Sequence, residues 1–148
     1  MTGLYYEEFV VGGEHTTPGR TITESDIAQF AALTGDWNPV HTDEESSKRG
    51  PYGTRIAHGL FGLSLIEGLK FRLGHFAGTA IASLSWNIRF ALPIKIGDTL
   101  HVRVKIASKR ETKKRDRGIV VEFTQLCNQR GEVVTEGEHV VMVVRKPA

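Results

Sequence analysis

The stretch His58-Gly59-Leu60-Phe61-Gly62-Leu63-Ser64-Leu65-Ile66-Glu67-Gly68-Leu69-Lys70-Phe71-Arg72-Leu73 decides the fold of this 148-residue chain. It contains no proline and is apolar nearly all round when wound as a helix, which predicts a helix from Gly59 to about Leu73. A helix that is apolar on most faces is wrapped by other elements rather than laid on a surface. Gly62 and Gly68 allow close approach of a neighbouring backbone at some cost in helix stability.

The sequence after this helix changes to a period of two, which is typical of strands. Four segments show it: 80–90, 100–106, 119–128 and 133–144. Short links between successive strands predict an antiparallel meander. A wrapped helix and a long antiparallel sheet together give an α+β fold, with the sheet curled round the helix and residues 1–148 in one domain. Exposed sheet edges have to be covered or paired, so we expect a homodimer.

The residues before the helix begin with 4–22, which we interpret as two short strands: the first ends at Gly12-Gly13, and the second, His15 to Ile22, is interrupted by Pro18-Gly19. Thr23-Glu24-Ser25-Asp26 then has the pattern of a helix start, because a Thr cap and an acid three positions later satisfy free N–H groups. Gly35 ends this helix. Its buried face is predicted to hold Ile27, Phe30, Ala31 and Leu33.

The loop Gly35-Asp36-Trp37-Asn38-Pro39-Val40-His41-Thr42-Asp43 carries the first candidate chemistry. Pro39 prevents a helix from running through it, so Asp36 and His41 are expected on irregular backbone. An Asp beside a His supplies a base with its orienter, or an acid–base pair. Ordinary turn chemistry explains the same residues equally well. The polar connection that follows, 42–55, is long, with one helical turn expected at 44–49.

Composition excludes several classes of protein. Hydrophobic residues make up 40% and charged residues 24% of the chain, as in average soluble proteins. The apolar run 60–69 is too short to cross a bilayer, and no secretory signal precedes it, so we expect a cytoplasmic protein without a membrane partner. The single Cys127 cannot form an internal disulfide or complete a cysteine metal site.

The net charge of +2 has a local origin, because basic residues crowd the segment 109–117. A solvated hairpin tip is the ordinary interpretation of such a run. The alternative is a surface for an anionic partner, such as the phosphates of a nucleotide-bearing substrate. No aromatic residues are interleaved with this charge, so a nucleic-acid partner is not expected.

Three blocks occur in an order that resembles a known family. They are Asp36-Trp37-Asn38-Pro39-Val40-His41-Thr42-Asp43, then Ile56-Ala57-His58-Gly59 at the start of the buried helix, then Phe90-Ala91-Leu92-Pro93-Ile94-Lys95-Ile96-Gly97-Asp98-Thr99-Leu100. The chain closely resembles the MaoC-like dehydratases and (R)-specific enoyl-CoA hydratases, from about Phe9 to Val144. The resemblance implies a hot-dog fold and the reversible hydration of trans-2-enoyl-CoA to (R)-3-hydroxyacyl-CoA.

The resemblance also implies roles for particular residues. The family's motif aspartate and histidine fall on Asp36 and His41, which would hold and activate one water molecule. Its helix-opening glycine falls on Gly59, whose N–H would bind the thioester carbonyl. Asn38 would orient the loop, and the CoA arm would lie along a groove close to a dimer interface.

The reaction is consistent with these assignments on physical grounds. Hydration needs a base for the water and stabilisation of the enolate oxygen, and the N-terminus of a helix favours a developing anion. It needs neither a metal nor a redox cofactor, so we expect no cofactor and no metal.

One residue departs from the family pattern. Some of these hydratases have a small hydroxyl residue on the buried helix where this chain has Glu67. A carboxylate on a mostly apolar helix must be solvated, paired or neutralised. Glu67 either lies on a wet face or pairs with an arginine such as Arg89, or it contacts substrate. In the last case the chain could be an acyl-CoA thioesterase that uses Glu67; a third possibility is a non-catalytic acyl-CoA-binding module.

Two further residues are candidates for substrate binding. His58 is expected to cap the helix or bond a loop carbonyl rather than act as an acid or base. Arg55 is placed to meet a phosphate or a substrate carboxylate, although a surface ion pair explains it as well. The histidines without a partner at ligand spacing are interpreted as strand or loop residues: His15, His75, His101 and His139.

Overall fold

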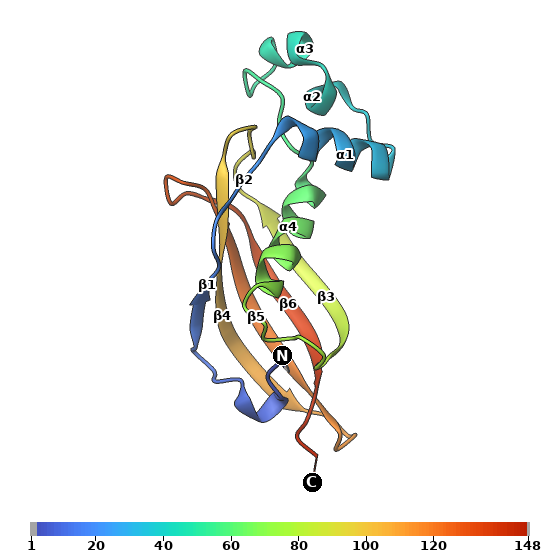
Figure 1. Ribbon diagram of the computed structural model, residues 1–148, viewed down its shortest axis with the longest axis vertical. Coiled ribbons are helices and arrows are strands. Elements are labelled where there is room, and N and C mark those ends of the chain that lie inside the picture. The colour runs from blue at the N-terminus through green and yellow to red at the C-terminus, as the bar shows by residue number, and fades with distance from the viewer. Residues whose placement is uncertain (1–2, 148) are drawn as a thin grey trace.

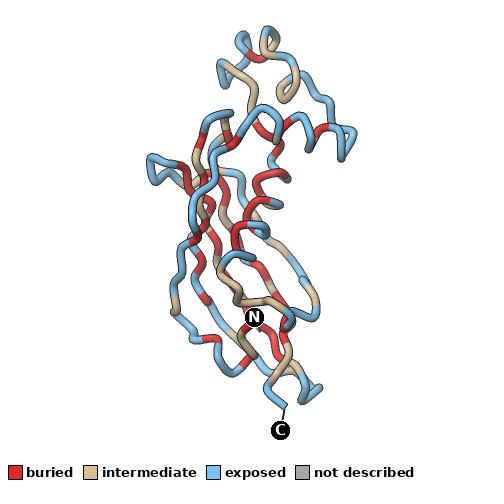
Figure 2. The backbone as a smooth tube through the Cα atoms, in the orientation of Figure 1, coloured by how far each residue is buried: buried red, intermediate tan, exposed pale blue. Residues whose placement is uncertain are grey.

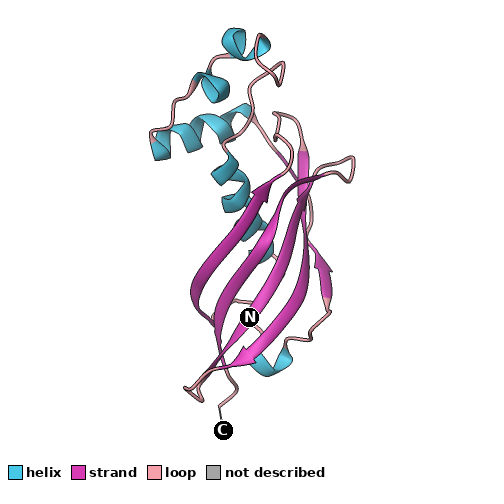
Figure 3. Ribbon diagram, turned by 180° about the vertical axis from the view of Figure 1, so that it is seen from behind, coloured by secondary structure: helices cyan, strands magenta, loops and turns pink. Residues whose placement is uncertain are grey.

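The computed structural model describes residues 3–147 and shows one long helix packed on a curled antiparallel sheet. Four long strands form the sheet: β3 (Ala80–Phe90), β4 (Thr99–Glu111), β5 (Arg117–Cys127) and β6 (Val133–Val144). Two short strands, β1 (Glu14–Thr16) and β2 (Arg20–Thr21), pair with β4. Helix α4 (Gly59–Phe71) crosses one face of the sheet, as Figures 1 and 3 show from opposite sides. The predicted α+β architecture is confirmed.

The other helices gather beyond one end of the sheet, beside the start of α4 (Figure 1). They are α1 (Glu24–Thr34), α2 (Pro39–Thr42) and α3 (Glu44–Lys48). A short 3-10 turn, Tyr6–Glu8, lies towards the opposite end. A strand had been expected here, but the Tyr5 backbone N–H donates to the Glu8 carboxylate at 2.8 Å and closes a turn instead. The strand expected within residues 15–22 corresponds to β1 and β2.

The strand order corrects the predicted meander. β4, β5 and β6 are consecutive neighbours as expected, but β3 pairs with β6 rather than with β4, giving the order β1-β4-β5-β6-β3. The link 91–98 carries the chain across the end of the sheet, where the N–H groups of Ala91 and Leu92 both donate to the Val134 carbonyl. Strands lie about 4.8 Å apart, so a link of this length spans the two intervening strands without strain.

The main core lies between α4 and the sheet, where the buried residues gather in Figure 2. Phe61, Leu65, Ile66 and Leu69 of α4 pack with inward residues of the sheet strands. A second cluster closes the other end of the sheet around Phe9 and Ile106. Each large apolar side chain buried in this way contributes about 1.5–3 kcal/mol relative to exposure.

Helix α4 is less enclosed than its sequence predicted. Leu60 is 59% exposed and Phe71 is 75% exposed, because the sheet covers only one side of the helix. The predicted approach of a backbone is found at neither glycine: a Cβ atom on Gly62 would lie 2.9 Å from the side-chain atom Ile94 Cδ1, and one on Gly68 would meet nothing within 4 Å. One flank of α4 therefore remains open in the single chain.

Candidate active site

The helix α1 delivers Asp36 to the site. Thr23 caps its start and forms a capping box with Asp26, and Gly35 ends it in the left-handed conformation at φ 78°. Both ends agree with the sequence prediction. Its buried face is narrower than predicted, because Ile27 and Ala31 are buried but Leu33 is 82% exposed.

The backbone around His41 is helical rather than irregular, contrary to expectation. Asn38 caps the single turn α2, and its side-chain oxygen accepts the Val40 N–H at 3.2 Å. Pro39 occupies the first helical position, where its missing N–H is not needed and its fixed φ suits a helix start. The Asp36 carboxylate in turn accepts the Asn38 N–H at 3.2 Å. Asn38 thus fixes the loop through its backbone and its side chain.

The His41 ring is oriented by a backbone carbonyl. Its Nδ1 lies 2.7 Å from the Ile56 carbonyl oxygen, which can only accept, so Nδ1 carries the hydrogen and Nε2 keeps its lone pair. The Ile56 segment is itself held by a bridge to Lys95. The ring nitrogen available for chemistry is therefore Nε2.

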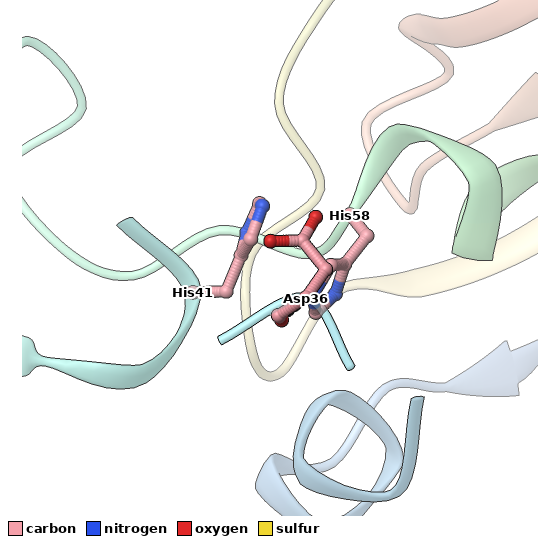
Figure 4. Close-up of side chains that lie close together, drawn as sticks. All are labelled: Asp36, His41 and His58. Carbon is pink, nitrogen blue, oxygen red and sulfur yellow. Dashed lines mark hydrogen bonds between the residues drawn. The ribbon is translucent and has the colours of Figure 1, made fainter. Parts of the chain in front are cut away.

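His58 connects this loop to the start of α4. It is the N-cap residue of α4, it is only 3% exposed, and its Nε2 donates to the Asp36 carbonyl oxygen at 2.9 Å. Its ring stacks on that of His41, with centroids 3.8 Å apart and planes 28° apart. Figure 4 shows the three side chains of Asp36, His41 and His58 gathered beside the first turn of α4. The expected contact of His58 with a loop carbonyl is present.

An open cavity of about 330 Å³ lies against these histidines. His41, His58 and Gly59 contribute to its wall, and most of the rest is apolar, including Phe90, Leu92, Pro93 and Ile94. A Cβ atom on Gly59 would lie 3.0 Å from the Phe90 ring, so a larger residue here would have to displace this ring by a few tenths of an ångström. The N–H groups of Gly59 and Leu60 come before the first hydrogen bond of α4, which the Phe61 N–H donates to the His58 carbonyl at 3.1 Å, and the helix dipole is positive there, which suits an anionic oxygen.

Asp36 and His41 lie close together without bonding to each other. Within residues 3–147, no hydrogen bond joins the Asp36 carboxylate directly to the His41 ring, yet one candidate ligand atom from each of Asp36, His41 and His58 lies within 4.8 Å of the others. Such residues can bind a divalent metal. A metal–nitrogen bond of about 2.0–2.1 Å lies in the plane of its imidazole, and two nearly parallel stacked rings do not offer a common point at that distance.

Arg55 and Glu67 do not join this group. Arg55 forms ion pairs with Glu24 at 2.7 Å and Glu44 at 3.0 Å, so it fastens α1 to α3. Glu67 lies on α4 with its side chain 49% exposed and pairs with Lys70 at 2.9 Å. The predicted wet face is confirmed for Glu67. The predicted pairing with Arg89 is wrong, because Arg89 pairs with Glu136.

The sequence analysis missed a buried charged cluster under α4. Lys70 lies 2.6 Å from the Glu122 carboxylate, with side chains 3% and 1% exposed, and its Nζ is 3.0 Å from His139 Nδ1. Burial acts to raise the pKa of Glu122, but the ion pair with Lys70 and the neighbouring His139 outweigh it and hold that pKa below its usual range. His139 was interpreted as a strand residue without a partner. The inward position of Glu122 in the alternating β5 pattern was the available signal.

Comparison with known proteins identifies the family. The family model described as "MaoC like domain" matches residues 9–126. The chain belongs to this family. A 3-hydroxybutyryl-CoA dehydratase of Methylorubrum extorquens is 36% identical over 144 residues, covering 97% of this chain and 86% of that protein. An (R)-specific enoyl-CoA hydratase of Rhodospirillum rubrum is 35% identical over 141 residues, covering 95% and 92%. The predicted enzyme class, hydro-lyase, is that of these MaoC-like relatives.

Solved structures agree with the fold. A protein titled monoamine oxidase regulatory protein from Archaeoglobus fulgius superposes with a TM-score of 0.92 at 30% identity, covering 99% of this chain and 98% of that one. A double hot-dog protein of Mycobacterium tuberculosis superposes with a TM-score of 0.82 at 18% identity, covering 98% of this chain and 45% of that one, which supports the fold alone. The predicted hot-dog fold is confirmed. No helix within residues 3–147 has the length and apolar character needed to cross a membrane.

Proposed function

We propose that this MaoC-like protein adds water reversibly to trans-2-enoyl-CoA and forms (R)-3-hydroxyacyl-CoA. The observation that carries the proposal is that His41 and Gly59 line one largely apolar cavity at the N-terminus of α4, and that Asp36 lies close to His41 and His58 beside it. Relatives named as an enoyl-CoA hydratase and a 3-hydroxybutyryl-CoA dehydratase support the same reaction.

The proposed mechanism uses three groups of this chain. Asp36 and His41 hold a water molecule between them, and Asp36 takes its proton as the oxygen bonds to the β-carbon. The electrons of the carbon–carbon double bond move onto the thioester oxygen, which the Gly59 N–H and the positive end of α4 stabilise. Asp36 then gives the proton that it took from the water to the α-carbon, which restores the Asp36 carboxylate and turns the enolate back into a thioester. Removing one oxyanion donor typically costs about 10²-fold in rate.

The test is hydration of crotonyl-CoA, followed as loss of enoyl thioester absorbance. Asp36→Asn and His41→Ala should each lower kcat by at least about 10²-fold, which is the ordinary contribution of a positioned acid or base. Circular dichroism and thermal unfolding verify that the variants fold. Activity near that of the wild type in either folded variant would contradict the assignment.

The thioesterase alternative has no supporting contact. Glu67 is engaged by Lys70 and is absent from the wall of the cavity. Release of free CoA from saturated acyl-CoA, abolished in Glu67→Gln, would revive it. Binding of acyl-CoA without turnover of any enoyl-CoA would favour the non-catalytic module instead.

We also propose that two copies pair through β3. This strand hydrogen-bonds to β6 on one side, and its other edge has no neighbour among the described strands. Ile81 and Leu84 on β3 are 42% and 45% exposed, and Phe71 of the nearby helix is more exposed still. An unpaired edge beside exposed apolar side chains invites pairing with an identical edge across a two-fold axis.

A further inference from the structure

The hairpin that joins β4 to β5 ends in a basic tip. Its four exposed basic side chains form no ion pair within residues 3–147: Arg110, Lys113, Lys114 and Arg115. The acids beside them are already engaged, since Asp116 pairs with Arg117 at 2.7 Å and Glu111 pairs with Arg145 at 3.2 Å. The positive charge of the basic tip is therefore uncompensated, and lysine and arginine in such a place suit phosphate groups.

The strand register places the basic tip and the cavity at opposite ends of one chain. The start of β3 lies in one row with the base of the tip, through the pairs Ala80–Val143, Val143–Gly118 and Gly118–Glu111. Phe90, at the end of β3, pairs with Thr135, and both line the cavity. Because β3 has 11 residues at about 3.4 Å each, roughly 34 Å of strand separates the two ends, as Figure 1 shows.

The proposed pairing through β3 brings the two features together. Identical edge strands that exchange the same hydrogen bonds across a two-fold axis run antiparallel. An axis near the middle of β3 pairs this strand along its whole length and keeps both α4 helices on one face of the joined sheet. The partner's basic tip then lies at the end of the sheet that holds this chain's cavity. The partner's β5, from which its tip projects, is three strand spacings, or about 14 Å, from this chain's β3.

The cavity borders the edge at which the partner would begin. Phe90 is the last residue of β3, and it lines the cavity together with the next two residues, Ala91 and Leu92. An acyl-CoA carries a diphosphate and a further phosphate on its ribose, joined to the thioester by the long pantetheine arm. With the acyl group in the cavity, these phosphates lie outside it, where a second chain can reach them.

Two cations at the cavity end of the same chain are already committed. Arg55 is held by Glu24 and Glu44, and Lys95 Nζ donates to the carbonyl of Tyr52, a residue of the cavity wall. Neither side chain is free to bind a phosphate without losing these contacts.

We infer that the basic tip of each chain binds the CoA phosphates of the substrate held in the other chain's cavity. The inference rests on the proposed hydratase function and on the proposed pairing through β3. Each substrate site is then shared, with the reacting groups on one chain and the phosphate-binding side chains on its partner.

A matched pair of double variants tests the role of the basic tip. The tip variant is Lys114→Gln with Arg115→Gln. The control is Arg103→Gln with Lys105→Gln on β4, whose side chains alternate with buried Val102 and Val104 and so point away from α4. Both remove one lysine and one arginine.

The substrates for this test are crotonyl-CoA and crotonyl-pantetheine, which lacks the phosphates. The quantity measured is the ratio of kcat/KM for the first to that for the second. At low ionic strength this ratio should fall at least about 5-fold in the tip variant and less than about 2-fold in the control, because exposed charge contacts are individually weak but add.

A mixed dimer tests whether the tip acts across the interface. Two differently tagged chains are co-expressed and purified through both tags, so that only mixed dimers are assayed. When one chain carries Asp36→Asn with an intact tip and the other carries the tip variant, the one active cavity faces an intact tip, and the wild-type ratio should return. When both changes lie in one chain beside a wild-type partner, the ratio should be that of the tip variant.

An unchanged ratio in the tip variant, an equal fall in the control, or a ratio set by the active chain's own tip would overturn the inference. Failure to recover any mixed dimer would overturn it as well, because the pairing would be absent. A wild-type protein that hydrates neither substrate, or full activity in Asp36→Asn, defeats the proposed function instead, so the two failures are distinguishable.

Discussion

Breaking the buried ion pair under α4 should destabilise the protein strongly. Lys70 Nζ and the Glu122 carboxylate are 2.6 Å apart and almost fully buried. Lys70→Met preserves the apolar stem of the side chain but leaves the Glu122 carboxylate buried without its cation. Loss of one partner of such a pair costs about 3–5 kcal/mol. In a chain of this size that is a fall in Tm of roughly 10 °C.

The two single variants should differ, because Lys70 has a second carboxylate. In Glu122→Gln, Lys70 keeps its contact with Glu67 at 2.9 Å, so the loss should be smaller than in Lys70→Met. The double variant buries neither charge and should cost less than the sum of the two, with a coupling of about 2 kcal/mol. Urea unfolding at fixed protein concentration measures all four proteins, since the proposed pairing of two chains would make stability depend on concentration.

The stabilisation that Glu122 provides should depend on pH. Because its pKa is lowered in the folded protein, Glu122 stabilises the fold above its unfolded pKa of about 4.3, and this stabilisation is lost as the pH falls through the folded pKa. The stability gap between wild type and Glu122→Gln should therefore be full at neutral pH and shrink below about pH 4. A Lys70→Met loss under about 1 kcal/mol together with zero coupling would refute the reasoning.

Two predictions concern other parts of the molecule. Gly35→Ala should lower the free energy of unfolding by about 1 kcal/mol, because Gly35 has φ 78°. Gly68→Ala, on the exposed side of α4 with no atom near its Cβ, should raise that free energy by about 0.5–1 kcal/mol. Urea unfolding that gives both changes the same sign would contradict this. The proposed pairing through β3 should give a dimer at micromolar concentration in sedimentation equilibrium, and Leu84→Lys should shift it towards monomer; a wild-type protein that is monomeric throughout that range would contradict it.

The helices were predictable from sequence because their signals are local. The Thr23 capping box and the Gly35 stop are each written in a few adjacent residues, and both ends of α1 were predicted correctly. The apolar run of α4 likewise marks one long helix. Local backbone chemistry decides such ends before any tertiary contact forms.

The strand order was not predictable in the same way. Alternation of apolar and polar residues identifies a strand and its two faces but does not determine which other strands it pairs with. The expectation that short links join neighbouring antiparallel strands was correct for the tip after Glu111 and for the turn before Val133. It failed at 91–98, because this longer link can cross the end of the sheet and place β3 beside β6.

The charged cluster shows a further limit. Glu122 stood at an inward position of an alternating strand, and Lys70 stood on an apolar helix, so each was visible as an anomaly. Their partnership depends on how α4 is set against the sheet, which no local pattern contains. An isolated buried charge in a sequence therefore predicts that a partner exists without saying where it is.

The candidate site derives its geometry from backbone groups more than from side-chain packing. The Ile56 carbonyl turns the His41 ring, the Asp36 carbonyl holds the His58 ring, and the Asn38 N–H fixes the Asp36 carboxylate. Asp36 follows the end of α1 and Asn38 caps α2, whereas Ile56 lies in a loop that its bridge to Lys95 holds in place. Substitutions that shift α1 or α2 should therefore misplace the reacting groups even where they touch none of them, because rate is sensitive to displacements of about 1 Å.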